Sequence, residues 1–110
     1  MSLSKDYKPF SGQTNITTAG TRQSVTGNTD ISLSRVKAVV IRAHSANTGR
    51  IYVGAAGLVS NTVGYILDPG EALSLSCIEE TGTFIDLNNI WVDTETSGND
   101  ISYFGLREGV

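Results

Sequence analysis

Short hydrophobic runs recur about every ten residues along most of the chain. The runs are rich in β-branched and aromatic residues, and segments of Gly, Asn, Ser, Asp and Pro separate them. Strand-forming runs divided by turn-forming residues at this spacing are typical of antiparallel sheets. The pattern therefore predicts an all-β protein with one antiparallel domain. A β-sandwich, a jelly roll and a small barrel all fit it.

The strongest predicted strand is 36–43. Val36, Ala38 and Val40 alternate with Lys37, Val39 and Ile41, and successive side chains of a strand point to opposite faces. Both faces are thus partly apolar, which predicts a central strand. We expect 51–53 to pair with it across the turn-rich loop 45–49.

A second clear pattern covers 65–77. Asp68-Pro69-Gly70-Glu71 has Pro and Gly at its two central positions, which favours a type II turn because Pro presets φ and Gly accepts positive φ. In the run that follows, Leu73, Leu75 and Cys77 alternate with Ser74 and Ser76. This alternation predicts a strand with one buried face. Further strand signals lie at 83–87, 90–93 and 100–106.

Residues 1–20 form the predicted N-terminal arm, and 21–110 the β-sandwich domain. Apolar residues are sparse in the arm, and Pro9 lies between Tyr7 and Phe10. Three interpretations are open: a frayed terminus, an extension whose two aromatics anchor it on a neighbouring protein, and an edge strand of the domain itself. On the second interpretation, deleting residues 1–15 weakens partner binding and leaves the melting temperature nearly unchanged.

The length and net charge of the chain exclude several classes of function. A chain of 110 residues corresponds to one domain. The net charge of −3 gives no basic surface for phosphates, so we expect no nucleic-acid partner. No apolar run approaches the roughly 20 residues that span a bilayer, and the first residues do not resemble a signal peptide. We therefore expect synthesis in the cytoplasm and no membrane partner.

Residues for catalysis are few. His44 is the single histidine and Cys77 the single cysteine, so a catalytic dyad or a zinc site would depend on those two residues. Cys77 shares a face with Leu73 and Leu75, which predicts a small buried side chain. The sequence therefore predicts no enzyme, no cofactor and no metal site.

The carboxylates leave one alternative open. Asp93, Glu95, Asn99 and Asp100 lie close together in sequence, and Asp68 is expected at the same end of the fold. Oxygen-rich loops bind Ca²⁺, although this spacing matches no EF-hand. A solvated hairpin loop is the other interpretation.

Trp91 is the last candidate for a residue that binds a partner or ligand. It alternates with Ile90 and Val92, so it lies on the opposite face from those two residues. It could pack within a sheet covered on both faces, anchor a subunit interface or serve as a platform for sugar rings, with Tyr52 or Tyr65 as further platforms. We predict partner-interface roles for Tyr7, Phe10 and Trp91.

Three segments, 47–54, 64–75 and 87–93, carry a resemblance to a known group of proteins. The motifs Asn47-Thr48-Gly49, Gly64-Tyr65 and Asp68-Pro69-Gly70-Glu71 follow one another in an order that resembles small virion structural proteins of tailed bacteriophages. That group includes head decoration (cement) proteins with β-sandwich folds. The resemblance covers about residues 36–106.

The resemblance implies a virion protein without catalytic residues. We expect a decoration protein on the exterior of the capsid that binds the major capsid protein and itself, as a homotrimer. A tail or baseplate adaptor, or a receptor-binding module, is the first alternative. A carbohydrate-binding β-sandwich module is the second.

Overall fold

The computed structural model describes residues 7–26, 31–55, 64–78 and 82–108. Within these ranges there is no α-helix, and none of the helical turns could cross a membrane. The described residues form eight strands and two short 3₁₀ helices, which are β1 (Tyr7–Ile16), β2 (Gln23–Ser24), η1 (Ile31–Ser34), β3 (Val36–Ala43), β4 (Ile51–Ala55), β5 (Tyr65–Leu67), β6 (Ala72–Ser76), η2 (Leu87–Asn89), β7 (Ile90–Thr94) and β8 (Asn99–Glu108).

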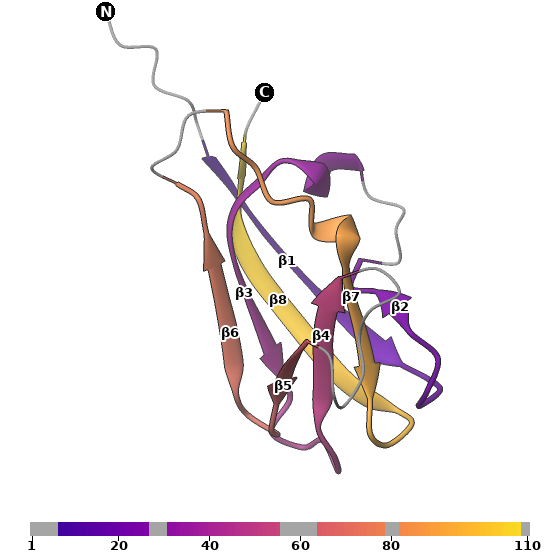
Figure 1. Cartoon of the computed structure of the whole chain (residues 1–110). Coiled ribbons are helices and arrows are strands. Elements are labelled where there is room, and N and C mark those ends of the chain that lie inside the picture. Colours follow the sequence, from indigo (N-terminus) through magenta and orange to yellow (C-terminus); the bar gives the residue numbers. More distant parts are fainter. Residues whose placement is uncertain (1–6, 27–30, 56–63, 79–81, 109–110) are drawn as a thin grey trace, which may run out of the picture.

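The strands build two antiparallel sheets of four strands each (Figure 1). Sheet A has the order β1-β8-β3-β6, and sheet B has the order β2-β7-β4-β5. Inward side chains of both sheets form one hydrophobic cluster, with Val39 and Ile41 from sheet A and Ile51, Val53 and Val92 from sheet B. The predicted all-β fold is confirmed, and its two layers are sandwich-like.

β3 is a central strand, as its two apolar faces predicted. It pairs with β8 on one side and with β6 on the other. The expected partner 51–53 was wrong, because β4 lies in sheet B between β5 and β7. The chain between β3 and β4 therefore crosses from one sheet to the other, and Ile51 is buried in the core between them.

The turn and strand predicted at 68–77 are confirmed. Glu71 N donates to Asp68 O at 2.9 Å, and Gly70 has a φ of 88°, as position three of a type II turn requires. In β6, Leu73 and Leu75 are partly buried while Ser74 is exposed.

The predicted N-terminal arm is not confirmed. Residues 1–6 lie outside the described residues, and Tyr7–Ile16 is β1, paired with β8 along all ten residues. Phe10 packs against the hydrophobic core, and Ile16 is fully buried in it. Residues 7–16 are therefore an edge strand of the domain, because they pair with β8 on one side and their inward side chains pack on the core.

Candidate interaction surface

The outer face of sheet A carries an exposed hydrophobic patch. Phe104 of β8 is 58% exposed and Val40 of β3 is 40% exposed. They are directly opposed in the β3–β8 ladder, so their side chains lie on the same face. Ala38 and Leu106 are the next outward pair of this ladder. We call Ala38, Val40, Phe104 and Leu106 the Phe104 patch.

Small polar side chains surround the patch. Ser11 of β1 pairs with Phe104, and Ser74 of β6 pairs with Val40. Two shallow depressions of about 550 and 240 Å³ flank the Phe104 ring, and Arg42 is the single charged residue that lines them. A partner that covered the ring would gain roughly 1–2 kcal/mol from that side chain alone. An apolar centre with a rim of mostly small polar side chains suits a protein partner.

The outer face of sheet B differs. Tyr52 of β4 and Asp93 of β7 pair on that face but are only 9% and 7% exposed. Asp93 Oδ1 accepts from the backbone N–H of Gly20 at 2.9 Å, so the segment before β2 lies against this face. Among the described residues, the open apolar face is therefore that of sheet A.

The three residues predicted for an interface are not brought together. Phe10 faces inward, partly buried, with its ring centre 6.1 Å from that of Tyr103. Tyr7 lies near the start of β1, opposite Glu108. Trp91 is partly buried in sheet B, between Ser24 and Gly54. Their roles in partner binding stay predictions, and none of the three belongs to the Phe104 patch.

Sequence reasoning missed Phe104, although a signal exists. Tyr103 and Phe104 are adjacent in one strand, so their rings must point to opposite faces. Tyr103 packs against the core. The second aromatic is consequently displayed on the outside of the sheet.

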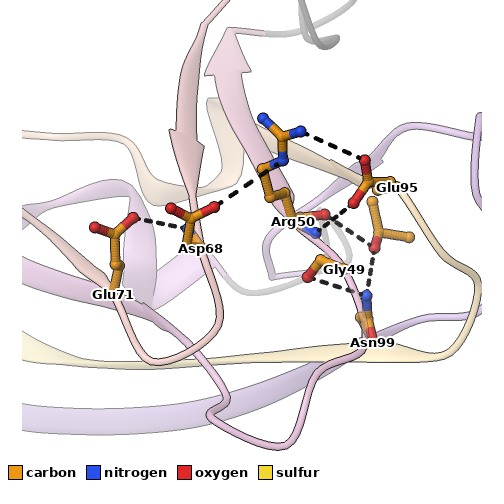
Figure 2. Close-up of polar contacts among 7 residues, drawn as sticks. Gly49, Arg50, Asp68, Glu71, Glu95 and Asn99 are labelled. Atoms are coloured by element: carbon orange, nitrogen blue, oxygen red, sulfur yellow. Dashed lines mark hydrogen bonds and ion pairs between the residues drawn. The ribbon is translucent and has the colours of Figure 1, made fainter.

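Two of the acidic residues considered for chemistry, Asp68 and Glu95, lie on either side of Arg50, as Figure 2 shows. The guanidinium lies 4.0 Å from Asp68 Oδ1 and 3.8 Å from Glu95 Oε2. Asp68 therefore does lie at the same end of the fold as Glu95, as expected. Both ion pairs are solvent-exposed, and pairs of this kind contribute at most about 1 kcal/mol to stability.

Asn99 has a structural role beside this cluster. Its side-chain amide donates to Thr94 Oγ1 at 3.0 Å and to Gly49 O at 3.4 Å (Figure 2). Its Oδ1 accepts from Thr48 N at 3.0 Å. Within the described part of the chain, no group of three His, Cys, Asp or Glu residues is placed to hold a metal ion. The hydrogen bonds of Asn99 join loop 45–49 to the end of β7.

His44 and Cys77 lie at opposite ends of the β3–β6 pair. His44 follows the end of β3, and its backbone N–H donates to Asp100 O at 3.2 Å. Cys77 N donates to Lys37 O at the start of β3. The thiol is partly buried and contacts Thr83 O at 3.3 Å. The single histidine and the single cysteine therefore do not form a dyad.

No protein-family model matches the chain, and no curated protein matches it. The fold and the surface define a class of protein: an all-β, sandwich-like domain with an open apolar face on one sheet.

Proposed function

We propose that this protein is a non-enzymatic virion protein of a tailed bacteriophage that decorates the outside of the capsid as a homo-oligomer. In this proposal, the Phe104 patch docks on the major capsid protein. The resemblance of segments 47–54, 64–75 and 87–93 supports the phage assignment. The open apolar patch supports the mode of action, because contiguous exposed hydrophobic surface marks interaction sites.

The strand order supports a finer interpretation of the fold. Two sheets ordered β1-β8-β3-β6 and β2-β7-β4-β5 correspond to the order of an eight-stranded jelly roll built from two Greek keys. Viral capsid proteins and lectins both use this architecture. The jelly roll is therefore compatible with a virion role without establishing it, since one fold serves many functions.

The single observation that carries the proposal is the pairing of Phe104 with Val40 on the open outer face of sheet A. A decoration protein must be stable before it docks, and here the core is complete without the patch. Val39 and Ile41 are buried inside while Val40 stays outside. Folding therefore does not require the Phe104 patch, which stays available to bind a partner.

The direct test mixes purified protein with undecorated phage heads and measures binding by co-sedimentation and electron microscopy. We expect Phe104→Ser to weaken binding at least about tenfold, as the loss of a central aromatic contact does. Tyr65→Ser is the matched control, because Tyr65 is a 53% exposed aromatic on the other sheet. We expect Tyr65→Ser to bind like the unmodified protein.

Three outcomes would overturn the proposal. The unmodified protein could fail to bind heads, Phe104→Ser could bind as well as Tyr65→Ser, or gold-labelled antibody against the chain could mark the tail of virions. Melting curves of both variants serve as the folding control, and we expect them to match because both side chains are largely exposed.

A further inference from the structure

Strand β6 leaves one edge of sheet A open. Cys77 N donates to Lys37 O at 2.8 Å, and Ala43 N donates to Glu71 O at 2.9 Å. In an antiparallel ladder, bonded and non-bonded pairs alternate. The backbone groups of Leu73 and Leu75 therefore point to β3. Those of Ala72, Ser74 and Ser76 point away from it, and no strand of the described residues lies beyond them.

The other three sheet edges carry features that discourage pairing. The edge strands of sheet B are short, with two residues in β2 and three in β5. At the opposite edge of sheet A, β1 carries Lys8 and Pro9. Short strands, lysine and proline are devices that keep edges from pairing. β6 has five residues, none charged and none proline, so it is the edge best suited to accept a strand.

We propose that the occupant is β6 of a second copy of this chain, paired antiparallel about a two-fold axis at Ser74. This inference rests on the proposed homo-oligomeric function and names the surface that makes it. In this register Ser74 lies opposite Ser74 of the second copy, and Ala72 lies opposite Ser76. The outward backbone groups of these residues then form about six hydrogen bonds.

The side chains of β6 are complementary to themselves in this register. On the outer face, only Ala and Ser meet across the axis, so neither bulk nor charge opposes the approach. On the inner face, Leu73 lies opposite Leu75 of the second copy. Both leucines are partly buried at the edge of the core, and the pairing covers more of their surface. Glu71 falls opposite Cys77, which avoids a contact between like charges.

The symmetry has a consequence for assembly. An isologous contact of this kind closes at two copies, so it predicts a dimer in place of the homotrimer implied by the resemblance. The two copies of sheet A become one continuous sheet of eight strands. Their Phe104 patches then lie on the same outer face, because Val40 and Ser74 are outward neighbours.

Sedimentation velocity of the full chain tests the pairing, with Ser74→Pro and Ser74→Ala as a matched pair. Proline removes the N–H that points to the open edge and leaves the β3 ladder intact. Alanine keeps that N–H. We expect the unmodified protein and Ser74→Ala to be dimers, and Ser74→Pro to dimerise at least about tenfold more weakly. A monomer or a trimer for the unmodified protein, or equal dimerisation of the two variants, overturns the pairing.

A cross-link tests the register independently of whether Ser74→Pro folds. Opposed residues of a bonded pair have Cα atoms about 5.5 Å apart, which suits a disulfide. In a Cys77→Ser background, Ser74→Cys is expected to oxidise to a covalent dimer and Ser11→Cys, on the β1 edge, to remain monomeric. Equal yields would refute the register. A monomer that binds heads would overturn this inference alone, and a dimer that ignores heads would overturn the proposed function alone.

Discussion

At the scale of single residues, the burial of Lys37 is the feature that differs most from what the sequence suggests. The β3–β8 register shifts between Val36 and Ala38, and this irregularity leaves both Val36 and Lys37 buried, with Lys37 only 3% exposed. Lys37 Nζ donates to Thr83 O at 2.5 Å and to Cys77 O at 3.3 Å. It also lies 4.8 Å from the centre of the Phe84 ring. The ammonium group thus attaches Cys77, Thr83 and Phe84 to β3.

Lys37→Met should lower the free energy of unfolding by about 2 kcal/mol. Methionine fills a similar volume but cannot donate, so two carbonyls lose a charged donor, and such bonds contribute roughly 1.5–3 kcal/mol. Chemical denaturation followed by Trp91 fluorescence measures the change. Lys8→Met is the control, because Lys8 is exposed on β1. Equal stabilities of the two variants would show that the Lys37 contacts contribute nothing net.

The alternation of polar and apolar residues along a strand predicts correctly on which face most side chains lie, but it does not predict a β-bulge. The partly buried Leu73 and the exposed Ser74 follow directly from the period of two. Val36 and Lys37 were assigned to opposite faces, yet both are buried because an extra residue enters the strand there. Such an irregularity is set by β8 and by residues 83–85, which are distant in sequence. A local pattern carries no information about them.

At the scale of elements, β1 shows how a weak pattern can hide a long strand. Small and polar residues dominate β1, but its ten residues pair in register with β8. An added Cβ at Gly12 would collide with the ring of Tyr103, and one at Gly105 would collide with Ala38 O. Glycine therefore makes room for the packing of this edge. The strand forms because β8 supplies a partner, which composition alone cannot reveal.

Deletion of residues 1–15 is expected to lower the melting temperature by roughly 10 °C or more. It removes nearly all of β1 and the buried surface of Phe10, and losses of this kind cost about 3 kcal/mol or more. Deletion of residues 1–6 is the matched control, since it leaves all ten residues of β1 in the chain. Differential scanning calorimetry measures both. A melting temperature unchanged by the longer deletion would restore the arm interpretation.

At this scale, the feature that the sequence does not predict is which strands pair with each other. The turn 68–71 and the strand after it could be predicted because their formation depends on residues that are neighbours in the sequence. The strands that pair with β4 could not be predicted in this way, since the ladders with β5 and β7 join segments that lie apart in the sequence. Sequence proximity favoured β3 as the partner, but the chain crosses to the other sheet.

At the scale of the whole molecule, the two outer faces differ in what they offer a partner. Sheet B has Tyr52 and Asp93 buried on its outer face, whereas sheet A has Phe104 and Val40 exposed. Both the exposed face and the open β6 edge belong to sheet A. The candidate surface is therefore a property of the assembled sheet, and no single segment of the sequence contains it.

The two proposals together predict a link between dimerisation and capsid binding. A dimer presents two Phe104 patches to a repeating lattice, and a second linked contact can raise the apparent affinity by a factor of about 10²–10⁴. Ser74→Pro should therefore weaken binding to heads at least about tenfold, although its Phe104 patch is unchanged. Ser74→Ala should bind like the unmodified protein.

A titration of undecorated heads at protein concentrations where the unmodified chain is dimeric measures this link. The covalent Ser74→Cys dimer supplies the converse control, because it should retain tight binding even at concentrations where the non-covalent dimer dissociates. If Ser74→Pro is monomeric and still binds heads as tightly as Ser74→Ala, each copy docks alone. The Phe104 patch would then bind without the gain in affinity that dimerisation through β6 provides.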